Sequence, residues 1–172
     1  LGAFTSYGDE IAILIKRSDS YVVHKALENL EVKDSINLHF FTSADVKHHA
    51  DEVKKATSRV DASIVNVMDT ELRTFLLEQM DPKQTPVYAV RSTRNNKKLK
   101  QHGVVFDKKV RDYFDNRSEK NIKNMIRYVV HCESDASIDF AAPQKIPEIG
   151  IYHPDAPDFF KTYGAYDKWR SA

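Results

Sequence analysis

Short runs of apolar residues alternate along this chain with segments whose apolar residues recur at helical spacing. The runs at 11–15, 36–41, 62–68 and 87–90 are mostly apolar, which is typical of strands covered on both faces of a parallel sheet. Strands that alternate with helices at this length pair in parallel through right-handed crossovers. The sequence therefore predicts an α/β fold: a flavodoxin-like or Rossmann-like three-layer domain with a mainly parallel sheet of about five strands.

The intervening segments predict the helices. We expect one helix over 21–30, a second that begins at a Thr42 or Ser43 cap, and a third over 70–80 behind an Asp69 cap. The buried stripes of the second and third helices are predicted at Val46, Ala50, Val53, Val60, Leu72, Phe75, Leu76 and Gln79. Two further helices are expected after Asp107 and from Ser118, with inner faces formed by Val110, Tyr113, Phe114, Ile122, Met125, Ile126, Val129 and Val130.

Changes in composition divide the chain. Residues 9–133 are predicted to form the α/β domain, and residues 1–8 a disordered or added start. Residues 134–147 have no sustained period and contain two prolines, which indicates a linker. Residues 148–172 are predicted to form a last strand, 148–152, and a helix that lead into a following domain absent from this sequence.

Charge and apolar content exclude several classes of protein. The net charge of +1 argues against a nucleic-acid-binding protein, which would have a strongly basic surface. No apolar run approaches the roughly 20 residues that span a bilayer, and the start of the chain lacks the features of a signal peptide. With a single cysteine, Cys132, no internal disulfide forms. We therefore expect no nucleic-acid or membrane partner and a cytoplasmic location.

Nucleotide binding is disfavoured by the position of the glycines. A phosphate-binding turn needs glycine where the first strand meets the first helix, but residues 16–20 contain none. A flavin phosphate held by Ser and Thr in strand-end loops stays a weaker alternative. Adjacent helical residues point about 100° apart, so His48 and His49 are not expected to chelate one metal ion. We expect no cofactor, metal site or catalytic residue in this segment.

A basic run, 91–100, follows the carboxyl end of the fourth predicted strand. Ligands of open α/β sheets bind at that edge. The run is interpreted first as a solvated loop and helix face, as charge runs usually are. Contact with an anionic ligand or an acidic partner subunit is the alternative, with Arg91 and Arg94 preferred because the guanidinium fork suits carboxylates.

The end of the chain carries a specific motif. Residues 147–157 read PEIGIYHPDAP and are followed by an aromatic-rich stretch, 159–169. Upstream, residues 104–114 and 121–128 fit the segment that precedes this motif in one family, and 64–68 also fits. On these residues the chain resembles the large, porphyrin- or corrin-binding subunit of cobaltochelatase and magnesium chelatase. The similarity is concentrated in the second half of the chain.

The resemblance implies an N-terminal domain of the large subunit of an ATP-dependent metal chelatase. Cobalt insertion into a corrin precursor, as in cobalamin biosynthesis, is the favoured variant, and a magnesium-porphyrin chelatase is the second. In the complete complex, a cobaltochelatase-type ligase, this subunit would bind the tetrapyrrole substrate and receive a divalent metal, while ATP and Mg²⁺ would sit on AAA+ partner subunits. The segment alone would be inactive, with the rest of the large subunit and the AAA+ subunits as its partners.

Within the motif, His153 and Asp155 are the polar residues that the resemblance carries over. A purely structural role is the favoured interpretation of both residues. A residue before proline, such as His153, is restricted to extended geometry, and Asp before Ala-Pro is common in turns. Contact with the tetrapyrrole is the alternative role. A different class of function also stays open: a stand-alone flavodoxin-like module that binds a small molecule or signals.

Overall fold

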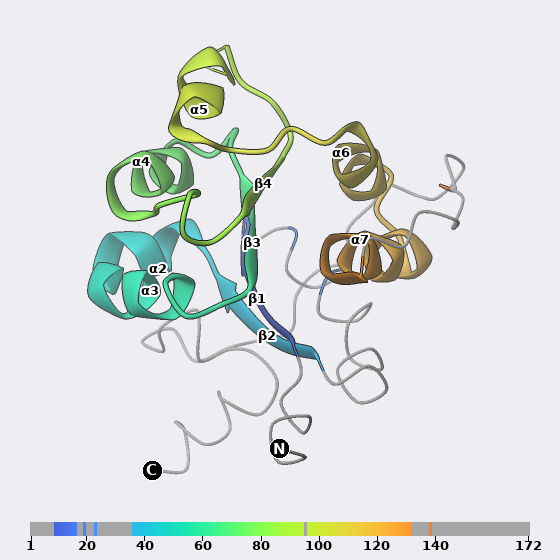
Figure 1. The fold of residues 1–172 in the computed structure, drawn as a ribbon, viewed down its shortest axis with the longest axis horizontal. Helices are drawn as coiled ribbons and strands as arrows, with labels where there is room; N and C mark the ends of the chain where they lie inside the picture. The colour runs from blue at the N-terminus through green and yellow to red at the C-terminus, as the bar shows by residue number, and fades with distance from the viewer. Residues whose placement is uncertain are drawn as a thin grey trace.

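Four parallel strands form the sheet of the computed structural model, which describes residues 9–16, 19, 23, 36–94, 96–131 and 138. The strands are β1 (Asp9–Leu14), β2 (Ile36–Phe41), β3 (Ala62–Asn66) and β4 (Val87–Val90). Their order is β2-β1-β3-β4 (Figure 1). This is the order in which the 2-1-3-4-5 winding of flavodoxin-like sheets begins.

The edge of the sheet beyond β4 carries one further pairing. Val105 forms a parallel bridge to Tyr88. The Val105 N–H donates to the Val87 carbonyl at 2.8 Å, and the Ala89 N–H donates to the Val105 carbonyl at 2.9 Å. The described part of the sheet thus has one strand fewer than the five expected, with a single residue in the next position. The strand predicted at 148–152 lies outside the described residues.

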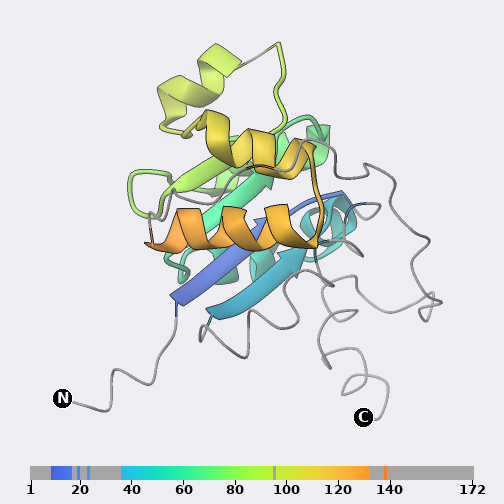
Figure 2. The ribbon, with the colours of Figure 1, turned by 90° about the vertical axis from the view of Figure 1, so that its right-hand side faces the viewer.

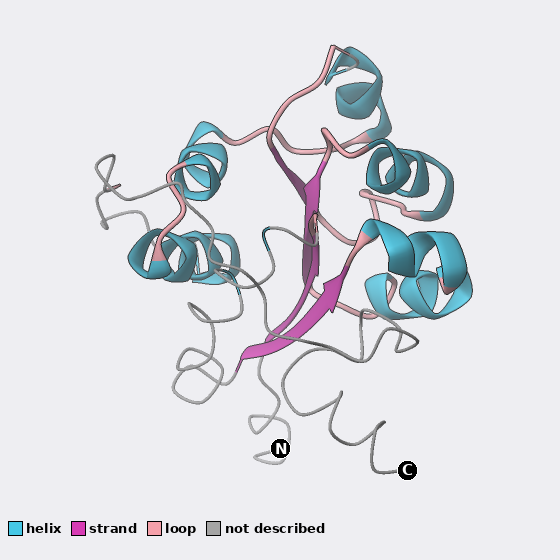
Figure 3. Ribbon diagram, turned by 180° about the vertical axis from the view of Figure 1, so that it is seen from behind, coloured by secondary structure: helices cyan, strands magenta, loops and turns pink. Residues whose placement is uncertain are grey.

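Helices cover both faces of the sheet. One face carries α2 (Ser43–His48), α3 (Ala50–Thr57), α4 (Thr70–Gln79) and α5 (Asn96–His102), and the other carries α6 (Lys108–Asp115) and α7 (Glu119–His131). Figure 1 shows these two helical layers on opposite sides of the strands, and Figure 3 shows them from behind. The predicted three-layer parallel α/β fold is confirmed.

Alternate residues of each strand supply two separate cores. On β1, Ile11 and Ile13 point into the core beneath α6 and α7, while Ala12 and Leu14 point into the core beneath the other helices. In Figure 2, α6 and α7 lie across the strands on the side that faces the viewer. Their buried contribution to the first core consists of Val110, Tyr113, Phe114, Ile122, Met125, Ile126 and Val129. Only Val130 of the predicted inner face is partly exposed.

The caps expected from the sequence form. Asp69 accepts the Leu72 N–H at 3.1 Å, and Asp107 accepts the Lys109 N–H at 2.8 Å. The Thr42 N–H donates to the buried Asp45 carboxylate at 2.8 Å, which completes a capping box at the start of α2. Each cap satisfies a backbone donor that the first helical turn leaves unpaired.

Two helix predictions need correction. The single helix expected behind a Thr42 or Ser43 cap is two helices, α2 and α3, because His49 between them adopts φ −136° and ψ 41°. Val46 and Val53 are buried on the two helices as predicted, Ala50 is only partly buried, and Val60 is buried in the turn after α3. On α4, Gln79 is exposed and the next residue, Met80, is buried instead. Of the helix predicted over 21–30, only Val23 is described, and it is buried and helical.

Candidate functional site

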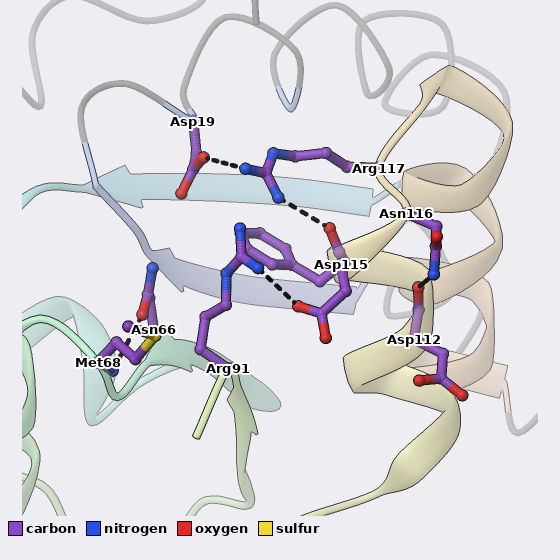
Figure 4. A network of polar contacts seen from close by, with 9 residues as sticks. Asp19, Asn66, Met68, Arg91, Asp112, Asp115, Asn116 and Arg117 are labelled. Atoms are coloured by element: carbon purple, nitrogen blue, oxygen red, sulfur yellow. Dashed lines mark hydrogen bonds and ion pairs between the residues drawn. The ribbon is translucent and has the colours of Figure 1, made fainter. Parts of the chain in front are cut away.

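The carboxyl edge of the sheet gathers polar residues from separate parts of the chain. Because β1 is paired with β2 on one side and β3 on the other, the winding changes direction between β1 and β3. Open α/β sheets bind ligands in the crevice outside the carboxyl ends of their strands, at such a switch point. Figure 4 shows the side chains at this edge, which include Asp19, Asn66, Arg91, Asp115 and Arg117.

A buried ion pair joins the segment after β1 to the loop between α6 and α7. Arg117 Nη2 lies 3.1 Å from Asp19 Oδ1, and the two side chains are only 8% and 4% exposed. Arg117 Nη1 also donates to the Phe114 carbonyl at 3.1 Å. Burying two charges costs desolvation free energy that their attraction only offsets, so the pair adds little net stability. Removing one partner, however, would leave the other charge buried and uncompensated, which destabilises the fold.

A second, more exposed ion pair lies beside the first. Arg91 Nη1 is 3.0 Å from Asp115 Oδ1, with side chains 28% and 42% exposed. The guanidinium carbons of Arg91 and Arg117 lie 5.5 Å and 5.2 Å from the centroid of the same Phe114 ring. Two cations, two carboxylates and one aromatic ring therefore form a single cluster, which we call the arginine cluster (Figure 4).

The backbone of Arg91 is strained. Its φ of 64° is the only positive value among the non-glycine residues that the structure describes. The left-handed region costs an L-residue roughly 1–2 kcal/mol, and Arg91 has neither glycine's missing Cβ nor asparagine's local hydrogen bond to offset that cost. The turn directs the Arg91 side chain from the end of β4 toward α6, where it meets Asp115 and Phe114.

Opposing effects act on the pKa of Arg117 within the arginine cluster. Burial lowers the pKa of the Arg117 guanidinium, and the neighbouring Arg91 lowers it further, while Asp19 and Asp115 raise it. Within the described residues, Arg117 Nε is buried without a hydrogen-bond acceptor. An unmet buried donor costs about 1–3 kcal/mol, so the cluster holds Arg117 in an environment that is incompletely compensated.

An apolar residue lies near the arginine cluster. Asn66, at the end of β3, is buried and accepts the Met68 N–H at 3.0 Å through its side-chain oxygen. Met68 is 54% exposed. Methionine is flexible and polarizable, which suits contact with flat apolar ligands. The edge thus offers a partly exposed cation, Arg91, and an exposed apolar side chain, Met68, while the Phe114 ring is buried.

The residues predicted from the sequence have different outcomes. Arg91 lies at the carboxyl edge as expected, but it is paired with Asp115 instead of forming part of a solvated run. Arg94 is exposed in the turn before α5 and belongs to none of the ion pairs found in the described ranges. His153 and Asp155 lie outside the described residues. Their proposed contact with a ligand stays a prediction.

Sequence reasoning missed Asp19, Asp115 and Arg117. Asp115 and Arg117 lie between two predicted helices, and Asp19 lies in the turn after the first predicted strand, where the sequence shows no pattern that singles them out. Arg117 is 98 residues from Asp19, and Arg91 is 24 residues from Asp115. The sequence offers one signal: parallel strands bring their carboxyl ends to one edge of the sheet. That signal indicates which loops lie at the edge, but it does not indicate which of their charged residues pair with one another.

The histidines occupy separate places. His48 is exposed at the end of α2, His39 lies 2.9 Å from Glu10, and His102 lies 2.9 Å from the Met80 carbonyl. No three His, Cys, Asp or Glu side chains come together as a metal site within the part of the chain that the structure describes. In the same part, no helix has the length and apolar content needed to cross a bilayer.

Comparison with known proteins gives a partial match in the second half of the chain. Residues 111–172 match the family described as CobN/Magnesium Chelatase. A magnesium-chelatase subunit from Chlorobaculum parvum is 30% identical over 60 residues, which is 35% of this chain and 5% of that protein. One from Rhodobacter capsulatus is 45% identical over 54 residues, 29% of this chain and 4% of that protein. No solved structure matches.

These matches confirm the resemblance seen in the sequence for the second part of the chain. The aligned stretches span only about one twentieth of either relative. The family match begins within α6, so it includes Asp115 and Arg117 but neither Arg91 nor Asp19. The arginine cluster therefore joins residues inside the match to residues before it.

Proposed function

With the match of residues 111–172 to the CobN/magnesium chelatase family as the premise, we propose that this chain is the N-terminal α/β domain of the large subunit of an ATP-dependent metal chelatase. In this proposal the domain holds or orients the tetrapyrrole substrate and performs no metal insertion itself. Cobalt insertion into a corrin precursor is the favoured variant, although both relatives are named as magnesium-chelatase subunits. Metal and ATP act in the complete, cytoplasmic complex with AAA+ partner subunits.

The observation that supports a ligand-binding role is the arginine cluster at the carboxyl edge. Arg91 is partly exposed and is held by a carboxylate that is itself 42% exposed. Corrin and porphyrin precursors carry peripheral carboxylates on a flat macrocycle. A ligand carboxylate can replace Asp115 on the planar guanidinium fork of Arg91 without reorganising the buried Asp19–Arg117 pair. Met68 is exposed at the same edge and offers an apolar contact for the ring.

This exchange gives each residue a distinct role. Arg91 binds the ligand carboxylate, and Asp115 neutralises Arg91 while the edge is empty. Arg117 and Phe114 hold Arg91 in position, because both guanidiniums contact the one ring. Arg94, exposed three residues further on, supplies a second cation. A contact of His153 and Asp155 with the same ligand is part of the proposal and rests on the sequence motif alone.

The test is a titration of the full-length subunit with its tetrapyrrole, followed by tryptophan quenching or by the absorption band of the macrocycle. The double variant Arg91→Ala/Arg94→Ala should weaken binding by about tenfold or more, since each charge-assisted hydrogen bond contributes roughly 1.5–3 kcal/mol. Asp115→Asn should act in the opposite direction and tighten binding, because it removes the competing carboxylate. Chelation assays with Co²⁺ and with Mg²⁺ then decide the metal.

Arg59→Ala is a matched control, because Arg59 is exposed in the turn that precedes β3, at the amino end of the sheet. It should leave tetrapyrrole affinity unchanged. Normal tetrapyrrole affinity in the Arg91/Arg94 double variant would contradict the proposal and indicate that both residues only form a solvated loop and helix face. Weaker binding by Asp115→Asn would also contradict the exchange of carboxylates.

A further inference from the structure

The charges of this chain are strongly segregated. Between Pro82 and Phe106 there are six lysines and arginines and no aspartate or glutamate. The other 20 basic residues stand against all 25 acidic ones, so the rest of the chain carries a net charge of −5. The overall value of +1 therefore hides one cationic segment in an acidic protein. Such asymmetry indicates an interaction surface.

The structure places four of these six cations together. Arg94, Lys97, Lys98 and Lys100 are exposed on α5 and on the turn before it, and we call them the α5 basic surface. None of the four takes part in an ion pair within the described ranges. Lys100 instead lies 5.5 Å from the centroid of the Phe106 ring. Lys97 and Lys100 are three residues apart on α5, a spacing at which like charges repel one another, so an anionic partner would relieve that cost.

The helix that carries these cations is fixed to the domain. Leu99 is completely buried against the core beneath α2, α3 and α4. The His102 ring lies 2.9 Å from the Met80 carbonyl at the end of α4, which holds the carboxyl end of α5. Gly103, with φ 111°, then turns the chain back toward the sheet. The α5 basic surface is thus presented on a rigid support, which lowers the entropy lost on binding.

A groove of about 520 Å³ runs beside this surface, between α4 and α5. Its walls are partly apolar and partly polar, formed by Thr74, Leu77, Glu78, Lys98, Gln101 and His102. Leu77 and the methylene stem of Lys98 can contact an apolar side chain, while Glu78 makes the α4 wall less cationic than the α5 wall. A uniform polyanion is poorly matched to walls of this kind.

We propose that the α5 basic surface and the adjacent groove bind an acidic segment of another protein chain, with carboxylates on the lysines and an apolar side chain in the groove. The inference shares only Arg94 with the proposed tetrapyrrole site and is tested on the three lysines alone, and the surface lies before the family match begins. Nucleic acid is the weaker candidate. A protein that makes about 6–10 phosphate contacts needs more cations than these four, and the acidic remainder of the chain would repel a long polyanion.

The test uses the 172-residue chain and two synthetic peptides in a fluorescence anisotropy titration. One peptide alternates Glu and Asp with Leu, and the other has Gln and Asn in place of the acids. We expect the acidic peptide to bind, with an affinity that falls as salt rises, and the neutral one to bind far more weakly. Zero-length carboxyl-to-amine cross-linking should join the peptide to Lys97, Lys98 or Lys100.

Charge reversal at these lysines, Lys97→Glu/Lys98→Glu/Lys100→Glu, should weaken the acidic peptide by more than about tenfold. The matched control, Lys47→Glu/Lys54→Glu/Lys55→Glu, changes the charge equally on exposed positions of α2 and α3 and should have little effect. Circular dichroism verifies that both variants fold. Equal losses in the two variants, or cross-links elsewhere, would overturn the proposal, as would tighter binding of a single-stranded oligonucleotide of equal charge through the same lysines.

Discussion

Replacing Arg117 with methionine should destabilise the domain far more than the loss of an ordinary ion pair. The change keeps much of the side-chain volume but leaves the Asp19 carboxylate, 4% exposed, without its cation. Removing one partner of a buried pair costs about 3–5 kcal/mol, because the remaining charge stays desolvated and uncompensated. It also removes the contact with the Phe114 ring and the bond to the Phe114 carbonyl. We therefore expect a loss of about 3 kcal/mol or more in the free energy of unfolding.

The chain contains a matched control for this prediction. Lys123 Nζ and Glu119 Oε1 on α7 are separated by the same 3.1 Å, but their side chains are 26% and 59% exposed. Glu119→Gln should cost no more than about 0.5 kcal/mol, the usual value of an exposed helical pair. The two pairs have the same separation but differ in burial and in the further contacts that Arg117 makes with Phe114, so the control gives the size of an exposed pair of this length.

Urea denaturation followed by circular dichroism at the helical band measures both variants. With the single variant Asp19→Leu, the double variant Asp19→Leu/Arg117→Met completes a thermodynamic cycle, and it should recover part of the loss because no buried charge is left unpaired. A loss below about 1 kcal/mol for Arg117→Met would show that the pair behaves as a surface ion pair. The reasoning from burial would then be refuted.

Two further changes test local features of the fold. Asp69→Ala removes the acceptor of the Leu72 N–H and should lower the free energy of unfolding by about 1 kcal/mol, with Asp69→Asn close to wild type; equal losses in the two would contradict the capping role. Gly103→Ala places a Cβ 3.3 Å from the Pro82 Cβ at a φ of 111°, so we expect a loss of more than about 1 kcal/mol in thermal or urea unfolding; an unchanged midpoint would argue against this strained turn.

The sheet and both helical layers could be predicted because their signals are local. The apolar runs of β1, β3 and β4 and the stripes of α4, α6 and α7 each lie within a dozen residues, where periodicity reports burial directly. The break at His49 could not be predicted in this way. The residues around it include neither glycine nor proline, and Val46 and Val53 keep helical spacing across it.

The candidate site was predictable only in part, for a different reason. The position of Arg91 follows from strand order and local sequence, since the residue after β4 must lie at the carboxyl edge. Its partners depend on how α6 ends and on where the loop to α7 passes, which are tertiary features. Asp115 and Arg117 look like ordinary charged residues at a helix end, and their burial or pairing has no periodic pattern in the sequence.

The start of the family match inside α6 has a consequence for how the protein can be dissected. A polypeptide begun at residue 111 would keep most of α6 and all of α7 but lose every strand of the described sheet. Tyr113, Phe114, Ile122, Met125 and Ile126, all fully buried here, would face water. Exposed apolar area of that kind drives aggregation. The unit of sequence similarity is therefore shorter than the unit that folds, and expression boundaries belong before β1.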